Sequence, residues 1–286
     1  MDTPASPLPA LFLSHGSPMI ALEPGAAGAF MQRLGPAIDA AFGRPRAILA
    51  ISPHTAARRP VLLAAPRHEA VHDFGGFDAA LHRMRYDAPG SPALADAVQR
   101  RLGNAGIEVL RDDAAGGLDH GIWVPLRYLW PQADVPVLPL ALVPFMTPAQ
   151  LFELGRCLAP LREEGVLVLA TGSITHNLRL VAEGGRRVDL PERPESAAFR
   201  AWMHERAAAS DREALFDYRR RAPHAAFMHP TDEHLLPFYV AAGAGGLEPA
   251  PLRLHESVTY GVLGMDAYAF GPESGRLARA LDAGAA

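Results

Sequence analysis

The sequence contains no lysine, because each of its 27 basic residues is an arginine. This absence excludes a P-loop lysine, a Schiff-base lysine and the Ser-x-x-Lys nucleophile pair. The chain has one cysteine, Cys157, which leaves no internal disulfide, no Cys-x-x-Cys redox pair and no cysteine-rich zinc cluster. A bound metal would therefore need histidine, aspartate or glutamate ligands, and the chain has 12 histidines.

Motifs for common cofactors and nucleophiles are missing as well. No Gly-x-Gly-x-x-Gly follows an apolar run, so dinucleotide binding has no support. Ser17 and Ser173 each follow a glycine, but neither lies in a Gly-x-Ser-x-Gly elbow, which disfavours a serine hydrolase. The formal net charge of −4 provides no basic field, so nucleic acid is not expected as a partner.

Targeting signals are not expected either. The segment from Met1 to Pro9 has no basic region and no continuous apolar run, so we expect no export signal. The apolar pattern is broken every few residues by glycine or proline, so we expect no membrane as a partner. These observations predict a cytoplasmic protein, and they give no indication of its oligomeric state.

The pattern of apolar segments predicts an α/β fold. With 286 residues, 49% of them hydrophobic, the chain is long enough for a large packed core. Short apolar runs predict buried strands at Pro9–Leu13, Ala47–Ser52, Val61–Ala65, Val135–Val143, Val166–Ala170 and Val262–Phe270. Helical periodicity predicts helices at Ser91–Leu102, Pro148–Arg162, Glu195–Ala208 and Asp232–Ala242. We therefore expect one layered domain over residues 1–286, with a central mostly parallel or mixed sheet flanked by helices.

The most charged stretch of the chain lies between two of these predicted elements. It runs from Glu183 to Glu195 and contains Pro191 and Pro194. Charge and proline together predict a solvated surface loop before the next helix.

Three histidines follow predicted strands. His15 follows the first strand, His54 the second, and His176 the strand that begins at Val166. Ligands of open α/β sheets bind beyond the carboxyl ends of strands, so three imidazoles in this position indicate a metal or catalytic site. The alternative is that each histidine only caps its strand and hydrogen-bonds a loop.

A fourth histidine comes from the segment His229–Leu236, which we expect to begin a helix with Thr231 as its cap. His234 would then point from the first turn of a mostly apolar helix, and His229 would lie just outside it. Either of these imidazoles could complete a metal site.

Polar residues in two glycine-rich segments are candidates for substrate binding. Asp119 and His120 follow two glycines, and an acid beside a histidine suits substrate binding or proton transfer. The alternative for His120 is a hydrogen bond that braces the loop. Asn177 follows His176 and could hold the neighbouring loop or the substrate, although a plain turn residue is equally consistent with the sequence.

The segment from His68 to His72 matches the His-Glu-x-x-His zinc motif. This motif binds zinc only on a helix that places both histidines on one face. Pro66 and Gly75 leave room for about two helical turns at most. We therefore interpret this match as accidental and do not expect a metalloprotease.

Six motifs occur in order along the chain, and together they resemble the class III extradiol ring-cleavage dioxygenases, most closely their 4,5-DOPA dioxygenase-like branch. The resemblance extends from about Pro9 to the last predicted strand. The motifs are LFLSHGSPM (11–19), HDFGGF (72–77), YDAPGSPALA (86–95), GLDHGIWVPL (117–126), GSITHNL (172–178) and HPTDEHLLP (229–237).

The resemblance implies an α/β fold with a buried mononuclear metal site. It implies Fe(II) for the oxygen chemistry, with Zn(II) often found in the site instead. Residue by residue, His15 and His54 resemble the first two metal ligands and His234 the third. His176 resembles either a fourth ligand or the catalytic base, and His120 a residue of the substrate pocket.

The chain departs from the family pattern at two places. Thr55 follows His54 where the family more often has an aromatic residue, which changes the expected shape of the pocket. His229 occupies a position that the family does not always fill with histidine, so we expect it behind the metal ligands.

The implied reaction is the opening of a catechol-type aromatic ring with O2. His176 would accept a phenol proton as general base, and His120 would steady the substrate or the oxygen species. Asp73, Tyr86 and Asn177 are expected around the substrate. The residues alone also allow a zinc hydrolase in the same pocket, or a metal-binding protein that has kept only the fold.

Overall fold

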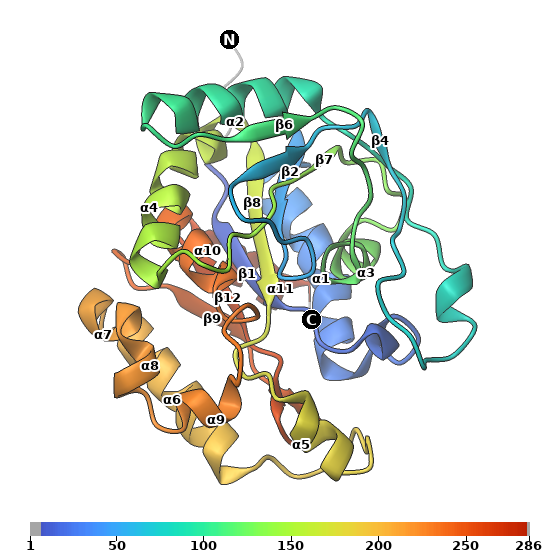
Figure 1. Ribbon diagram of the computed structural model, residues 1–286, viewed down its shortest axis with the longest axis vertical. Coiled ribbons are helices and arrows are strands. Elements are labelled where there is room, and N and C mark those ends of the chain that lie inside the picture. The colour runs from blue at the N-terminus through green and yellow to red at the C-terminus, as the bar shows by residue number, and fades with distance from the viewer. Residues whose placement is uncertain (1–6, 285–286) are drawn as a thin grey trace.

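A six-stranded mixed sheet forms the centre of the fold, in the strand order β7-β2-β8-β1-β12-β9 (Figure 1). The structure is a computed structural model that describes residues 7–284. The strands of this sheet are β1 (Ala10–Ser14), β2 (Ala47–Ile51), β7 (Val137–Pro139), β8 (Val166–Gly172), β9 (Leu252–His255) and β12 (Ala267–Phe270). Four of them, β7, β2, β8 and β1, run parallel, β12 is antiparallel to β1, and β9 is antiparallel to β12 and so runs in the direction of the first four. The predicted α/β class is confirmed, in its mixed form.

The central strands are apolar throughout because both faces of the sheet are covered. In β8, Val166, Val168 and Ala170 pack in one buried cluster, whereas Leu167 and Leu169 pack in a second cluster on the other face. Since side chains alternate between the faces of a strand, a doubly covered strand reads as a continuous apolar run.

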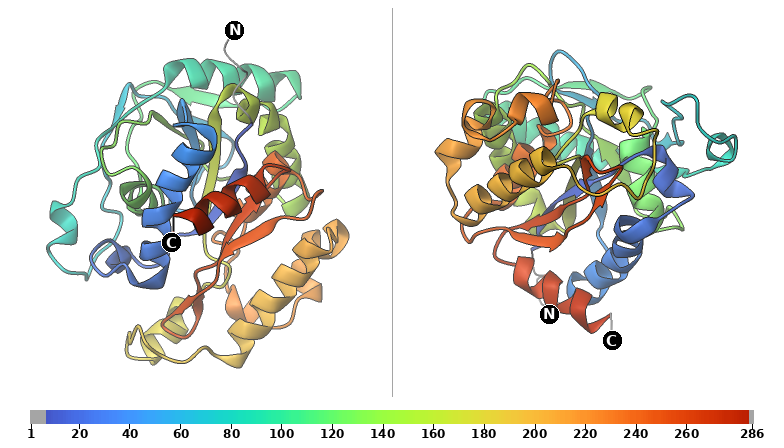
Figure 2. Two further views of the ribbon diagram at one scale, coloured as in Figure 1. Left: turned by 180° about the vertical axis from the view of Figure 1, so that it is seen from behind. Right: turned by 90° about the horizontal axis from the view of Figure 1, so that it is seen from below.

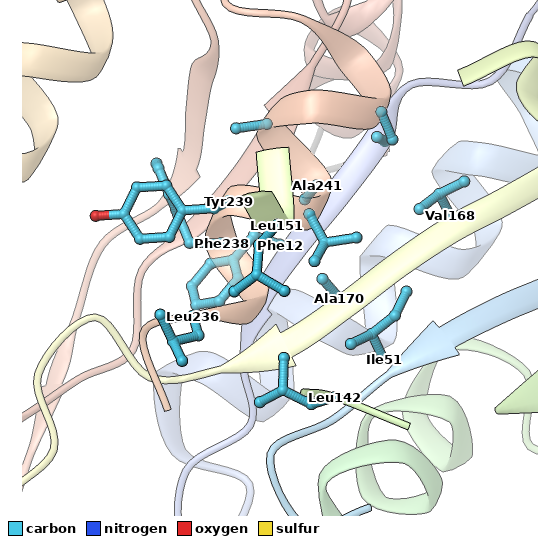
Figure 3. Packing of buried hydrophobic residues seen from close by; sticks show 14 of the residues in the cluster. Phe12, Ile51, Leu142, Leu151, Val168, Ala170, Leu236, Phe238, Tyr239 and Ala241 are labelled. Carbon is cyan, nitrogen blue, oxygen red and sulfur yellow. The ribbon is translucent and has the colours of Figure 1, made fainter. Parts of the chain in front are cut away.

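Helices form a layer on each face. On one face, α4 (Pro148–Leu158) and α10 (Pro237–Gly245) pack against each other, and α10 packs on β8 and β1. Figure 3 shows Phe238 of α10 against Phe12 of β1, and their ring centroids are 5.5 Å apart. On the other face, α1 (Gly25–Phe42) contacts α3 (His120–Leu129) and α11 (Ser274–Ala283), and Figure 2 shows α11 beside α1.

Shorter elements lie around these layers. The small strand pairs are β3 (Val61–Leu63) with β6 (Leu110–Asp112), β4 (Arg67–His68) with β5 (Ala88–Pro89), and β10 (Val258–Thr259) with β11 (Leu263–Gly264). The other α-helices are α2 (Pro92–Asn104), α5 (Leu178–Glu183), α6 (Pro194–Ala208), α7 (Arg212–Phe216), α8 (Tyr218–Arg221) and α9 (Ala225–Met228). Within residues 7–284, 3₁₀ helices span Pro18–Ala21, Leu81–Arg83 and Ala159–Glu164. Elements α5 to α9 lie beyond the carboxyl end of β8 (Figure 1).

Several predicted elements are shorter than the sequence suggested. Of Val135–Val143 only β7 is a strand, although beyond it the N–H of Leu140 still donates to the Ala50 carbonyl at 2.9 Å and Leu140 forms an isolated bridge with Leu62. The segment Val262–Phe270 divides into β11 and β12. The helix predicted over Pro148–Arg162 ends at Leu158 and continues as a 3₁₀ helix, where Pro160 lacks a donor.

The expectation of a helix over Asp232–Ala242 is wrong at its start, because α10 begins only at Pro237. Pro237 cannot donate to the carbonyl of Glu233, and the carbonyl of His234 accepts the N–H of Ser173 instead of a helical partner. His234 therefore lies in the turn that precedes α10.

Two further expectations concern the ends and the environment of the chain. The export-signal prediction for Met1–Pro9 falls mainly on residues 1–6, which lie outside the described residues. The domain bounds 1–286 stay a prediction for the same reason. None of the helices within residues 7–284 is long and apolar enough to cross a membrane.

Candidate active site

The carboxyl ends of three adjacent parallel strands carry the histidines that the sequence singled out. β2, β8 and β1 are neighbours in the sheet, and His54, His176 and His15 follow their last residues. The ring centroids of His15 and His54 are 5.1 Å apart. The predicted convergence of strand-end imidazoles is therefore present in the structure.

His234 joins this group from the turn before α10. The N–H of Ser173 donates to the His234 carbonyl at 2.9 Å, which fixes the turn against the end of β8. Gly172 permits this approach, because a Cβ at that position would lie 2.1 Å from the His234 carbonyl oxygen. The His234 ring centroid is consequently 5.0 Å from that of His54 and 5.5 Å from that of His15.

The Nε2 atom of His54 faces the Nε2 atoms of both His15 and His234 in this cluster. His54 Nε2 lies 3.2 Å from His15 Nε2 and 3.3 Å from His234 Nε2. Nitrogens that bind one ion at ~2.1 Å lie ~3.0–3.4 Å apart in octahedral or tetrahedral geometry. The observed separations match those of ligands on a single ion.

Carboxylates lie beside the Nδ1 atoms of two of these rings. His234 Nδ1 is hydrogen-bonded to Glu233 Oε1 at 3.1 Å, and His54 Nδ1 lies 3.3 Å from Asp73 Oδ2. A proton on His234 Nδ1 leaves a lone pair on its Nε2, which faces His54 Nε2 at 3.3 Å. Facing imidazole nitrogens with carboxylates behind them fit a divalent metal.

The electrostatics of the cluster keep the imidazoles neutral. Burial lowers the pKa of His15 well below 6.5, and burial together with the neighbouring histidines lowers the pKa of His54 to about 3. The hydrogen bond with His234 lowers the pKa of Glu233 to about 2. Neutral imidazoles beside ionised carboxylates are the protonation states that a divalent cation requires.

His176 stacks on His234 with 3.5 Å between ring centroids and 7° between ring planes. Nitrogen lone pairs lie in the plane of an imidazole, so two parallel rings cannot both direct one at the same ion. His176, Glu233 and His234 also have ligand atoms within 4.8 Å of one another, but the Glu233 carboxylate is already bound to His234 Nδ1. The geometry therefore separates His176 from the three facing nitrogens.

Asp73 connects His120 to the cluster. Its carboxylate accepts the His120 backbone N–H and the His120 Nδ1–H, each at 3.0 Å. Burial works to raise the pKa of Asp73, but the hydrogen bonds with His120 outweigh it and lower that pKa to about 2. With Nδ1 bound to Asp73, His120 has its Nε2 left as an acceptor.

Asp119 is buried beneath these residues and ties His54 to α3. Its carboxylate accepts hydrogen bonds from Ser52 at 2.7 Å and from Thr55 at 2.6 Å. Ser52 and Thr55 flank His54 in the chain, so the carboxylate fixes the loop that carries this imidazole.

The histidines open onto a cavity of about 640 Å³. Its lining includes all five of the clustered histidines together with Asp73. Apolar side chains supply much of the rest, among them Phe74, Leu178 and Leu263. Phe74 contacts the His120 ring edge to face, with centroids 5.6 Å apart. A cavity of this volume accommodates a small aromatic molecule beside the histidines.

The structure does not bring Tyr86 and Asn177 to the cavity, and it places His229 away from the cavity as well, where the sequence comparison expected it. The Tyr86 hydroxyl donates to the Trp130 carbonyl at 3.1 Å inside the core. Asn177 caps α5 and donates to the Phe227 carbonyl at 2.6 Å. His229 is fully buried behind the cluster, with Nε2 2.8 Å from the Ile174 carbonyl oxygen. The substrate-binding interpretation of Tyr86 and Asn177 is therefore not supported by their positions.

The zinc-motif segment is not helical, as expected. Arg67 and His68 form β4, and residues 69–72 are extended or irregular. His68 Nδ1 accepts the Gly117 N–H, whereas His72 Nε2 lies 3.1 Å from the Met84 carbonyl oxygen. The two imidazoles therefore serve different loops.

Sequence reasoning missed three residues of the site. Glu233 could have been found, since an acid directly before a candidate ligand is a natural partner for it. Phe74 lies in the HDFGGF motif, but no role was predicted for it. Arg186 lines the cavity, although it lies in the stretch from Glu183 to Glu195, for which only a solvated surface loop was predicted.

Comparisons with known proteins agree with this site. Residues 9–271 match the family described as the catalytic LigB subunit of aromatic ring-opening dioxygenase. A "4,5-DOPA dioxygenase extradiol" of Escherichia coli (strain K12) is 37% identical over 262 residues, covering 90% of this chain and 93% of that protein. A protein of the same description from Beta vulgaris is 34% identical over 260 residues, covering 91% and 95%.

A solved structure has the same fold. An uncharacterized protein of Escherichia coli K12 superposes with a TM-score of 0.72 at 29% identity, covering 92% of this chain and all of that one. The family match, the relatives and the fold agree over nearly the whole chain. The chain belongs to the LigB family of aromatic ring-opening dioxygenases.

Proposed function

We propose that the protein is an extradiol dioxygenase that opens a catechol-type ring with O2, with Fe(II) as its active metal. The observation that carries the proposal is the set of three Nε2 atoms, from His15, His54 and His234, at 3.2 and 3.3 Å spacing on the wall of the cavity. The family assignment favours this activity over the zinc hydrolase and over the non-catalytic protein that the residues alone left open.

The imidazole nitrogens of His15, His54 and His234 could bind either Fe(II) or Zn(II), the two metals that the family resemblance implies. Imidazole nitrogens suit both Fe(II) and Zn(II), so the ligands alone do not select between them. Fe(II), when bound, supplies the redox chemistry with O2 that zinc lacks. His15, His54 and His234 would hold the ion, while Asp73 and Glu233 would balance part of its charge through the ligand rings.

His176 is the general base of this proposal. Its ring nitrogens have no hydrogen-bond partner among residues 7–284, and the side chain lines the cavity. Burial, reinforced by His234, lowers the pKa of His176 to about 2, so the imidazole is neutral at physiological pH. A neutral, unpartnered imidazole can accept the proton of a catechol hydroxyl.

His120 positions the substrate from the other side of the cluster. The Asp73 carboxylate holds its Nδ1, so Nε2 is the atom available to a substrate hydroxyl. Phe74 packs on the edge of His120 and can contact an aromatic ring in the cavity. The apolar wall excludes water from the reacting groups.

The experiment is anaerobic loading with Fe(II), followed by a panel of catechols and then air. We expect a coloured ring-opened product from the iron form and none from the zinc form. Absence of turnover across the panel, with one iron bound per chain, would refute the proposal. The cytoplasmic location stays a prediction, which fractionation of cells tests, and we expect no nucleic acid or membrane partner.

A further inference from the structure

Arg200 lies buried on α6, outside the cavity, and forms a bidentate ion pair with Asp266. Its Nε donates to Asp266 Oδ2 at 2.7 Å, and its Nη2 donates to Asp266 Oδ1 at 3.0 Å. Arg200 is 4% exposed, and Asp266 is fully buried. The remaining nitrogen, Nη1, donates to both carboxylate oxygens of Glu192, at 2.8 and 2.9 Å. Two carboxylates therefore hold the guanidinium in one orientation.

A buried ion pair of this kind contributes little net stability, because the desolvation of both charges offsets most of their attraction. Loss of one partner is nevertheless costly, since the other charge is then left buried without a partner. The pair therefore acts mainly as a constraint on position, because the Asp266 carboxylate has to stay where the planar Arg200 fork meets it.

The backbone of Asp266 holds the residue directly before His15. Its carbonyl accepts the Ser14 N–H at 3.2 Å and the Ser14 hydroxyl at 2.9 Å. On the other side of His15, Gly16 packs closely against Met265, since a Cβ at Gly16 would lie 2.7 Å from Met265 Cε. Both neighbours of His15 in the chain are thus held by two consecutive residues of one segment.

The same segment, residues 262–266, also holds the residue directly before His176. The Thr175 hydroxyl accepts the Gly264 N–H at 2.7 Å. Arg200 packs directly on the segment at this point, since a Cβ at Gly264 would lie 2.7 Å from Arg200 Cδ. One buried side chain therefore supports the backbone beside a proposed metal ligand and beside the proposed general base.

We propose that Arg200 is a positioning residue for the site. It fixes the segment 262–266, and this segment fixes the backbone from which His15 and His176 project. Arg200 does not line the cavity, so it acts through Asp266 rather than by contact with a substrate. This inference rests on the proposed function, which assigns metal binding to His15 and proton transfer to His176.

Arg162 provides a matched control, because it is the other buried arginine in the part of the chain that the structure describes, at 8% exposed. It pairs with Glu273 at 2.8 Å, and its Nε donates to the Leu8 carbonyl at 2.6 Å. Leu8 precedes β1, whereas His15 follows it, so this ion pair lies at the opposite end of the strand. Arg200→Gln and Arg162→Gln each remove a buried guanidinium, but only the first is expected to loosen the site.

The first readout is hydrogen exchange of the metal-free protein, followed by mass spectrometry at urea concentrations that give the variants equal free energies of unfolding. A remaining difference in exchange then reports local opening. We expect the Ser14 and His15 amides to exchange roughly tenfold or more faster in Arg200→Gln than in Arg162→Gln, because the acceptor of the Ser14 N–H is no longer held. Equal exchange of these amides in the two variants would overturn the inference.

Co(II) binding gives a second readout, since the visible spectrum of this ion depends on the geometry of its ligands. We expect Arg200→Gln to bind Co(II) roughly tenfold more weakly than Arg162→Gln, with altered absorption bands. An unchanged affinity and spectrum would overturn the inference as well. Failure of the wild type to bind any metal would instead refute the proposed function, and the exchange comparison would still decide the role of Arg200.

Arg200→Lys covers the case in which Arg200→Gln does not fold. Lysine keeps a positive charge beside Asp266 and Glu192 but cannot form the planar fork. We expect its Ser14 and His15 amides to exchange faster than those of wild type at matched stability, and its Co(II) affinity to be lower. Wild-type exchange together with wild-type Co(II) affinity in this variant would contradict a positioning role of the fork.

Discussion

His176 stacks on His234 but does not share the hydrogen bond that His234 makes with Glu233. The two ring centroids lie 3.5 Å apart with 7° between the planes, and the Nδ1 of His234 is bound to Glu233, whereas the ring nitrogens of His176 form no hydrogen bond with any residue within 7–284. In the proposed function, His234 would hold the metal and His176 would accept the substrate proton. The two roles that the sequence left open for His176 are distinguished by the first prediction.

The first prediction concerns these two rings. His176→Gln should reduce kcat by roughly 100-fold or more, because general base catalysis is lost, while one metal per chain is retained. His234→Gln should lose both turnover and metal. Metal analysis together with steady-state kinetics distinguishes the variants, and loss of metal from His176→Gln would identify His176 as a ligand.

The second prediction concerns the carboxylate that joins two histidines. Asp73→Asn should weaken metal affinity roughly 10- to 100-fold, because His54 and His120 lose the charge that fixes their Nδ1 protons. Asp78→Asn is the matched control, since Asp78 lines the same cavity but bonds only within its own turn. Competition with a chelator measures both affinities. Equal affinities for the two variants would show that Asp73 does not support the ligands.

The third prediction concerns Gly243, a glycine of α10 at its contact with α4. A Cβ at Gly243 would lie 1.9 Å from the Phe152 carbonyl oxygen, so Gly243→Ala must push the helices apart. We expect the free energy of unfolding to fall by roughly 1–3 kcal/mol in urea titrations. Gly103→Ala in α2, where no atom lies within 4 Å of the added Cβ, should instead be neutral or slightly stabilising. Equal effects of the two substitutions would contradict the close packing.

The fourth prediction is an acid sensitivity of the metal-free protein. Burial lowers the pKa of His54 to about 3 and that of His229 to about 4, from an ordinary value of 6.5. Below pH 6.5 the unfolded chain therefore binds protons that the folded protein does not, and stability falls as the pH drops. The urea midpoint should decrease between pH 6.5 and 4.5, less steeply in His54→Asn. A midpoint that is constant over this range would show that the histidines are not buried in neutral form.

The sequence predicted the strands that carry the site better than the helices around them. Buried strands such as β8 read as continuous apolar runs, and the residues just after them could be assigned to one sheet edge. Helix α1 was not predicted, because Gly35 and Pro36 interrupt its pattern. Gly35 is explained only by a contact distant in sequence, since a Cβ there would lie 2.0 Å from the Leu129 carbonyl oxygen.

The site residues, too, could be predicted only where their position does not depend on contacts distant in sequence. His15, His54 and His176 could be placed from their strands, because the order of a parallel sheet brings strand ends together. Tyr86 and Asn177 were expected around the substrate, whereas their polar groups bond to the Trp130 and Phe227 carbonyls. Whether a polar side chain faces a cavity or a backbone carbonyl depends on tertiary contacts that spacing does not encode.

Anomalous diffraction from crystals loaded with Fe(II) or Zn(II) tests the central claim most directly. The account predicts one peak per chain, ~2.1 Å from the Nε2 atoms of His15, His54 and His234 together. A peak bound instead between His176 and Glu233, or no peak within reach of all three nitrogens, would contradict it.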